Sequence, residues 1–145
     1  MTHTPQPDDS IADNQKSLNA LVRSLRLSQG QFRLILVRCN YGELRQRMVQ
    51  RLGEVSPVPI RELVLPESVE SLYGFIKTEL ADEKPQAVIV LGLESVRNLT
   101  GVFKSSNYIR EELSHNFYFP LILWMNDPVW QRLIRVAPDL ESWAT

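Results

Sequence analysis

The chain is predicted to fold as a three-layer α/β sandwich, in which a short, mostly parallel sheet of about four strands is flanked by helices. Two observations predict this class. Short apolar runs alternate along the chain with segments whose apolar residues recur every three or four positions, which is the pattern of βαβ units. One of these runs, residues 87–91, holds five consecutive apolar residues, which indicates a strand covered by helices on both faces.

The composition fits one ordinary globular domain. The chain has 145 residues, of which 43% are hydrophobic and 23% are charged. The formal net charge of −1 predicts no general attraction to nucleic acid or to a membrane surface. No apolar run approaches the roughly 18 residues of a membrane helix, and the polar start has no secretory signal. The single cysteine, Cys39, cannot form an internal disulfide, so we expect a cytoplasmic protein.

The domain organisation is expected to be simple. Residues 1–10 contain two prolines and two acids, with no large apolar group after Met1, and are expected to be a disordered tail. Residues 11–145 are expected to form a single α/β domain. Because a four-strand core is small for this class, the alternative that the chain is a fragment of a larger protein with further domains stays open.

The first βα unit is predicted from a switch in periodicity. A helix is expected to begin near Ile11 and to end at Gly30. Its core-facing residues share three- and four-residue spacing: Leu18, Leu21, Val22 and Leu25. The compact apolar run 32–37 predicts the first strand. A turn at residues 39–42 then leads to a second helix, which is expected to end at Gly53.

The second strand is predicted at residues 60–65. It contains Arg61 and Glu62 and is therefore amphipathic, which places it at the periphery of the sheet. The next helix is expected to open at residues 66–68, because a proline and an acid suit a first helical turn, and to run to Leu80.

The last third of the chain is predicted to add one more strand and its helices. A loop is expected to reach from the third strand to about Ser105, followed by a helix that leads to the fourth strand, residues 119–124. Asp127 is predicted to be the N-cap of the final helix, because it directly precedes Pro128. Pro138 is predicted to end that helix.

The first candidate site lies after the first strand, because ligands of open parallel sheets bind beyond the carboxyl ends of the strands. Asn40, Tyr41 and Gly42 are candidates for cofactor binding, since the amides at the start of a helix favour an anion. A working phosphate loop also needs a lysine followed by serine or threonine, and residues 40–44 supply neither. A plain turn in which Glu43 complements the helix dipole is therefore the favoured interpretation.

Glu94 and Asp127 complete the set of candidate cofactor-binding residues. The third strand resembles the strand that presents a magnesium-binding aspartate in NTPases, but Gly92 stands where that acid would be, and Glu94 follows two residues later. A solvated loop residue is the simpler interpretation of Glu94, and a helix cap is the simpler interpretation of Asp127.

The sequence gives little support for nucleophilic catalysis or metal binding. Cys39 and His115 are the types of a nucleophile and its base, which leaves a small cysteine-dependent enzyme as one alternative, but no spacing brings them together. A small buried cysteine is the favoured interpretation. One cysteine and two separated histidines, His3 and His115, match no zinc pattern, so no metal site and no catalytic residue is assigned.

Two further groups of residues concern partners. Arg45, Arg47 and Arg51 are expected on a solvated helix face, because they are mixed with acidic and amide residues, so no nucleic-acid partner is expected. Trp130 and Trp143 are the candidate contacts with a protein partner, and Trp143 is the stronger of the two.

Three segments carry a resemblance to a family. The segments NYIREEL (107–113), FPLILWMND (119–127) and LIRVAPDLESWA (133–144) resemble the amino-terminal, P-loop-NTPase-like domain of large bacterial, mainly cyanobacterial, proteins with tetratricopeptide repeats. These proteins are similar to STAND and AAA+ signalling ATPases. The resemblance covers residues 16–145 and is most specific from residue 107 onward.

The resemblance implies a degenerate nucleotide-binding fold with a non-catalytic role in protein interaction or regulation. Its implied partners are a protein or other domains of a larger chain, with no cofactor and no enzymatic activity expected. Members with an intact phosphate loop bind ATP or GTP with magnesium, so a divergent nucleotide-binding signalling NTPase is the alternative. The positions of that loop, Asn40 to Leu44, lack the motif.

Overall fold

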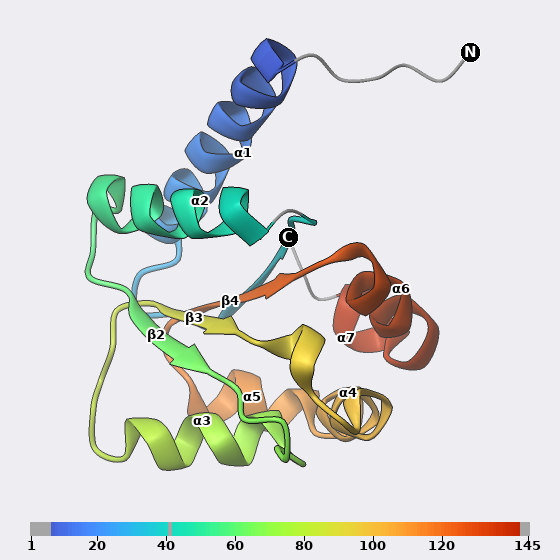
Figure 1. Cartoon of the computed structure of the whole chain (residues 1–145). Coiled ribbons are helices and arrows are strands. Elements are labelled where there is room, and N and C mark those ends of the chain that lie inside the picture. The colour runs from blue at the N-terminus through green and yellow to red at the C-terminus, as the bar shows by residue number, and fades with distance from the viewer. Residues whose placement is uncertain (1–6, 41, 143–145) are drawn as a thin grey trace.

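The computed structural model describes residues 7–40 and 42–142, with side chains from Lys16 onward. Its centre is a sheet of four parallel strands, listed here in chain order: β1 (Arg33–Arg38), β2 (Arg61–Val64), β3 (Val88–Leu91) and β4 (Pro120–Met125). All four strands lie where the sequence predicts them, and helices cover both faces of the sheet (Figure 1). The predicted three-layer α/β class is confirmed.

The described helices are α1 (Pro7–Leu27), α2 (Gly42–Val55), α3 (Leu72–Leu80), α4 (Leu99–Tyr108), α5 (Arg110–Asn116), α6 (Asp127–Val136) and α7 (Pro138–Ser142), with a short 3-10 turn, η1 (Leu93–Ser95). In Figure 1, α1 and α2 cover one face of the sheet, and α3 and α5 cover the other. No helix within the described residues has both the length and the apolarity to cross a membrane.

The strand order explains this distribution of helices. The order across the sheet is β1-β4-β3-β2, so the chain crosses the whole sheet from β1 to β2 and then steps back strand by strand. Crossovers between parallel strands are right-handed. The connection through α2 runs across the sheet from β1 toward β2, and the later connections run back toward β1. The helices of these two directions therefore lie on opposite faces of the sheet.

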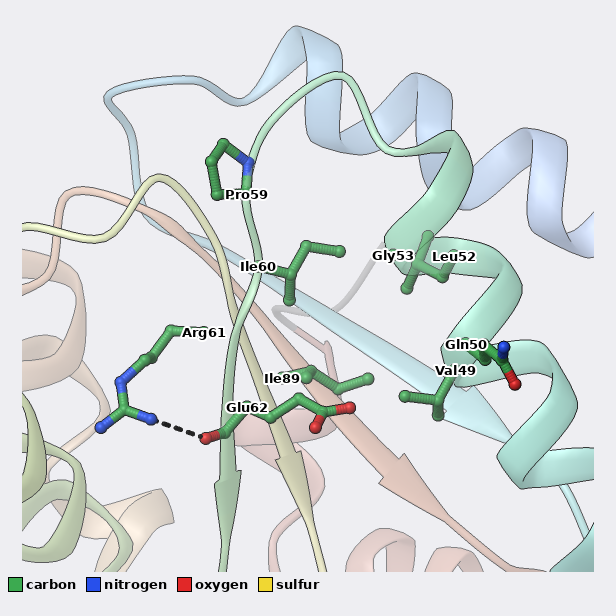
Figure 2. A pocket seen from close by; sticks show the side chains of 9 residues that line it. All are labelled: Val49, Gln50, Leu52, Gly53, Pro59, Ile60, Arg61, Glu62 and Ile89. Carbon is green, nitrogen blue, oxygen red and sulfur yellow. Dashed lines mark hydrogen bonds between the residues drawn. The ribbon is translucent and has the colours of Figure 1, made fainter.

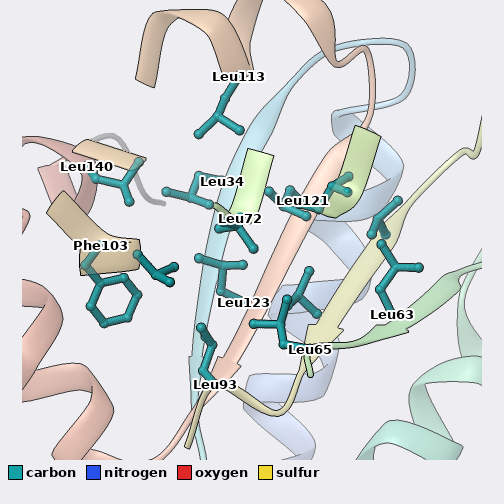
Figure 3. Packing of buried hydrophobic residues seen from close by; sticks show 14 of the residues in the cluster. Leu34, Leu63, Leu65, Leu72, Leu93, Phe103, Leu113, Leu121, Leu123 and Leu140 are labelled. Atoms are coloured by element: carbon teal, nitrogen blue, oxygen red, sulfur yellow. The ribbon is translucent and has the colours of Figure 1, made fainter. Parts of the chain in front are cut away.

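Two buried clusters hold the layers together. Successive residues of a strand point to opposite faces. Leu121 and Leu123 of β4 therefore join the cluster under α3 to α7, which Figure 3 shows with Leu34, Leu63 and Phe103. The second cluster lies under α1 and α2 and combines strand residues with helix residues: Ile35, Ile89, Ile122 and Trp124 with Leu18, Leu21, Leu25 and Leu52.

Two predicted helix starts are wrong. Residues 66–68 do not open α3, because Ser71 is its N-cap and the Ser71 hydroxyl accepts a hydrogen bond of 3.0 Å from the Gly74 amide. The predicted loop to about Ser105 contains η1 and most of α4, which begins at Leu99. That helix is capped by Asn98, whose side chain accepts a hydrogen bond from the Gly101 amide.

The two ends of the described chain also differ from expectation. Helix α1 begins at Pro7, so residues 7–10 are helical and do not belong to a disordered tail; residues 1–6 lie outside the described residues. Proline and the two aspartates that follow suit a first helical turn. At the other end, α6 ends at Val136, just before Pro138 as predicted, but Pro138 is also the first residue of a further helix, α7, which was not expected.

Candidate functional site

The sheet has a topological switch point between β1 and β4. These strands are neighbours, but the chain leaves β1 toward α2 on one face and leaves β4 toward α6 on the other (Figure 1). The Cys39 amide donates a hydrogen bond of 2.8 Å to the Met125 carbonyl and holds the two strand ends together. Ligands of open α/β sheets bind at such a point.

A cavity of about 210 Å³ opens at this switch point. Its lining comes from α2, η1 and the ends of both strands: Cys39, Asn40, Gly42, Arg45, Glu94, Trp124, Met125 and Asn126. We call these residues, together with the adjacent Arg38 and Asp127, the β1–β4 corner. The structure thus brings together Asn40, Gly42, Glu94 and Asp127, which the sequence proposes as cofactor-binding residues. Tyr41 lies outside the described residues.

Asp127 is the centre of a hydrogen-bond network at the corner. Its Oδ1 accepts hydrogen bonds from Arg38, at 2.9 Å from Nη2 and 3.2 Å from Nε. Its Oδ2 accepts one from the Asn40 amide group at 2.9 Å, and its own backbone N–H donates to Asn40 Oδ1 at 2.8 Å. These contacts lower the pKa of Asp127 below its ordinary value. The hydrogen bond from Arg38 has the largest effect, and the one from Asn40 has the next largest.

The predicted role of Asp127 as an N-cap is wrong by one residue. Asn126 is the N-cap of α6, and its side-chain oxygen accepts a hydrogen bond of 3.1 Å from the Val129 amide. Asp127 is then the first residue of the helix, where a carboxylate suits the helix dipole. Its side chain faces β1 and pairs with Arg38 and Asn40.

The lowered pKa of Asp127 predicts a specific pH dependence. Because the carboxyl binds its proton less tightly in the folded state, its contribution to stability is present above the unfolded-state pKa of about 3.9 and is lost as the pH falls through the folded-state pKa. We therefore expect wild type to be more stable than Asp127→Asn near neutral pH, with the difference shrinking below about pH 4. Urea denaturation from pH 6 downward measures this difference.

The matched control is Asp82→Asn, which changes an exposed aspartate in the segment after α3. It should leave the acid dependence of wild type intact. A constant difference between wild type and Asp127→Asn at every pH would show that the network does not depend on the charge of Asp127.

A second ion pair crosses the corner from the other side. Arg45, in the first turn of α2, pairs with Glu94 of η1, and their side chains are 32% and 28% exposed. The prediction that Arg45 lies on a solvated face is therefore wrong, whereas Arg47 and Arg51 are exposed as expected. The first turn of α2 borders the same cavity as η1, so Arg45 reaches Glu94 across it. Each arginine of the corner thus faces a carboxylate of this chain.

Gly92 determines what can follow β3. It has a φ of 91°, and a Cβ atom added there would lie 3.2 Å from the Leu65 carbonyl oxygen and 3.3 Å from the Leu65 nitrogen. The Leu65 amide donates to the Leu91 carbonyl at 2.9 Å, so this backbone is held in place. An aspartate directly after β3, which a magnesium-binding strand requires, would therefore meet both a strained backbone and a close contact.

Two tryptophans border the corner. Trp124 is 2% exposed, and its indole Nε1 has no hydrogen-bond partner within the described part of the chain. The ring of half-buried Trp130 lies 5.0 Å from the guanidinium of Arg38, which stacks over it. A partner contact at Trp130 stays a prediction. Trp143, the other predicted contact, lies outside the described residues.

The structure does not bring Cys39 and His115 together. Cys39 is half-buried at the corner, whose lining contains no histidine. His115 lies in the last turn of α5, next to Asn116, which lines a different cavity near the start of β4. Among the described side chains, residues 16–40 and 42–142, no group of three or more His, Cys, Asp or Glu is placed to hold a metal ion.

Another cavity lies at the outer edge of the sheet. It measures about 640 Å³ and lies between α2 and β2, with a mixed lining that includes the apolar Val49, Leu52 and Ile60 and the polar Gln50, Arg61 and Glu62. In Figure 2 the Glu62 carboxylate points toward this cavity, while Arg61 points away and donates a hydrogen bond of 3.2 Å to the Glu62 carbonyl. It shares no lining residue with the β1–β4 corner, and the sequence does not predict it.

The chain was compared with models of protein families, with curated proteins and with solved structures, and none of these matches it. The resemblance to STAND-like and AAA+-like domains, carried by residues 107–144, therefore stays a prediction.

Proposed function

We propose that the chain is a non-catalytic, regulatory protein-interaction module with a degenerate nucleotide-binding fold. The observation that carries the proposal is the pairing of Arg38 with Asp127 and of Arg45 with Glu94 at the switch point. A phosphate group entering the corner would meet two carboxylates as well as two arginines. Like charges close to a ligand phosphate oppose its binding, so the corner is poorly suited to a nucleotide.

The parts needed for phosphoryl transfer also support the proposal. A phosphate-loop NTPase uses a lysine on the phosphates, a serine or threonine on the magnesium ion, and an aspartate after a neighbouring strand. Residues 40–44 contain neither of the first two. The conformation of Gly92 disfavours the third. With the charges of the corner already paired, the site has a structural role, fixing α2 and α6 against the sheet.

The proposed partner is a protein or another domain of a larger chain, and we place the contact beside α6. Trp130 offers a half-buried ring there, and the Arg38 side chain next to it is half exposed. Aromatic residues and arginine are enriched in protein interfaces. The proposed regulatory role agrees with the STAND-like resemblance.

A second candidate function is a divergent ATP-binding or GTP-binding domain. The observation that favours it is the position of Arg45, which lies beside Asn40 and Gly42 at the start of α2. Arg45 would face an anion if Glu94 moved away. Against this candidate, the cavity of about 210 Å³ is smaller than the roughly 300–1,000 Å³ of most ligand sites.

Thermal denaturation with millimolar ATP or GTP and magnesium tests the proposal. The expected result is an unchanged Tm and no release of phosphate. A nucleotide at a hundred times its Kd would stabilise the fold by about 2.7 kcal/mol, so binding would be readily detected. A stabilisation of wild type that rises with nucleotide concentration would contradict the proposal.

The variant Glu94→Gln makes the test sharper, because it releases Arg45 from its carboxylate. Nucleotide binding by this variant but not by wild type would support the role of Glu94 in closing the corner. Glu54→Gln is the matched control, since it also breaks an arginine–glutamate pair of α2, with Arg51, but away from the corner.

A further inference from the structure

A cavity of about 420 Å³ lies at the edge of the sheet opposite the β1–β4 corner. It is enclosed by the end of α3, the segment that leads into β3 and the segment that leads into β4. Its volume lies in the range of roughly 300–1,000 Å³ that is typical of small-molecule sites. None of the predicted site residues lines it.

One wall of this cavity is aromatic. Tyr73 and Phe117 have ring centroids 5.4 Å apart, and Phe117 and Phe119 are stacked at 5.0 Å. Phe117 and Phe119 are buried, whereas Tyr118 between them is 69% exposed. Leu80 of α3 adds buried aliphatic surface. Because Phe117 and Phe119 are themselves buried, the aromatic surface that the wall leaves open to a ring of a ligand is that of Tyr73 and Tyr118.

The residues that line the cavity include more cations than anions. Lys77 and Lys84 both line it, and neither has an ion-pair partner among the described residues. The Lys77 ammonium group lies 5.7 Å from the ring centroid of Tyr73. Glu83 is the acid in the lining, and its carboxylate accepts a hydrogen bond of 3.2 Å from Arg61. The two lysines are thus free to receive an anion.

We propose that this cavity binds a small aromatic carboxylate, with the ring against Tyr73 and Tyr118 and the carboxylate between Lys77 and Lys84. An ammonium group paired with a carboxylate makes a stronger hydrogen bond than two neutral groups do. The aromatic wall and the two lysines together select for a ligand that has both a ring and a negative charge. This site is independent of the proposed function at the β1–β4 corner.

The test is a titration of the full chain with naphthalene-2-carboxylate, followed by two-dimensional amide NMR. We expect saturable shifts at Leu80, Lys84 and Phe117, with Asn40 and Gly42 unchanged. The neutral analogue naphthalene-2-carboxamide has the same ring without the charge and should bind roughly tenfold more weakly or worse. The double variant K77Q/K84Q should weaken binding of the carboxylate by a similar factor while its spectrum remains that of a folded protein.

The control variant is Lys104→Gln, which removes an exposed lysine of α4 that does not line the cavity. It should bind like wild type. The proposal is overturned if millimolar carboxylate shifts no amide near the cavity, or if the shifts gather at the corner. Equal affinity for the carboxylate and the carboxamide, unchanged in K77Q/K84Q, would also overturn it.

Discussion

Truncation of Trp124 to alanine is expected to lower the free energy of unfolding by about 3–5 kcal/mol, the usual cost of removing a buried aromatic side chain. Trp124 is almost fully buried at the end of β4 and packs with Ile35, Ile89 and Ile122 under α1 and α2. The ring packs under α1 and α2 and also lines the cavity of the β1–β4 corner, so its removal would enlarge an existing cavity. Urea denaturation at neutral pH measures the effect as a lower midpoint.

The variant Trp124→Phe separates packing from polarity. Phenylalanine retains most of the ring and removes Nε1, which has no hydrogen-bond partner in the described residues. A buried polar group without a partner costs about 1–3 kcal/mol, so its removal offsets part of the lost packing. Trp124→Phe should therefore cost much less than Trp124→Ala. Equal losses in the two variants would contradict this description of the indole.

Replacing Gly92 with alanine is expected to cost about 1–3 kcal/mol from the backbone conformation alone, with the contact to Leu65 adding to it. Residues other than glycine rarely adopt a φ of 91°. The new Cβ atom would also lie 3.2 Å from the backbone oxygen of Leu65. That oxygen belongs to a segment hydrogen-bonded to β3, so it cannot move freely. The same urea denaturation measures the loss.

Gly53→Ala is the matched control and should have the opposite sign. Gly53 lies within α2, and a Cβ atom added there has no other atom within 4 Å. Alanine is preferred over glycine inside a helix by about 0.5–1 kcal/mol, so this variant should be more stable than wild type. If Gly92→Ala were also neutral or stabilising, an aspartate after β3 would be tolerated, and one argument against a nucleotide site would fail.

The strands could be predicted because burial in a parallel sheet leaves a strong mark on the sequence. Residues 87–91 are apolar throughout, since helices cover both faces. Arg61 and Glu62 correctly indicate an edge strand. Most of helix α4 was predicted as a loop. Its buried residues are Val102, Phe103 and Ser106, and the polar Ser106 interrupts the helical spacing of apolar residues. Its Ser106 hydroxyl is satisfied internally by a hydrogen bond of 2.8 Å to the Val102 carbonyl.

The position of the candidate site could be predicted from the sequence, but the contacts between its side chains could not. The rule for parallel sheets puts Asn40 and Asp127 at the correct edge. Their contact joins residues 87 positions apart, and it depends on β1 and β4 being neighbours, which no local pattern encodes. The Arg45–Glu94 pair has the same origin. The cavity at the opposite edge combines residues of two distant stretches of the chain, 73–85 and 116–119, so it too leaves no local signal.

The central claim is that the chain's own carboxylates occupy the arginines of the β1–β4 corner, so that no nucleotide binds there. Amide NMR of the full wild-type chain, titrated with ATP and magnesium, tests it most directly. We expect the signals of Asn40, Gly42, Arg45 and Asn126 to stay in place up to millimolar nucleotide. Saturable shifts concentrated on those four amides would contradict it and would favour a divergent nucleotide-binding domain.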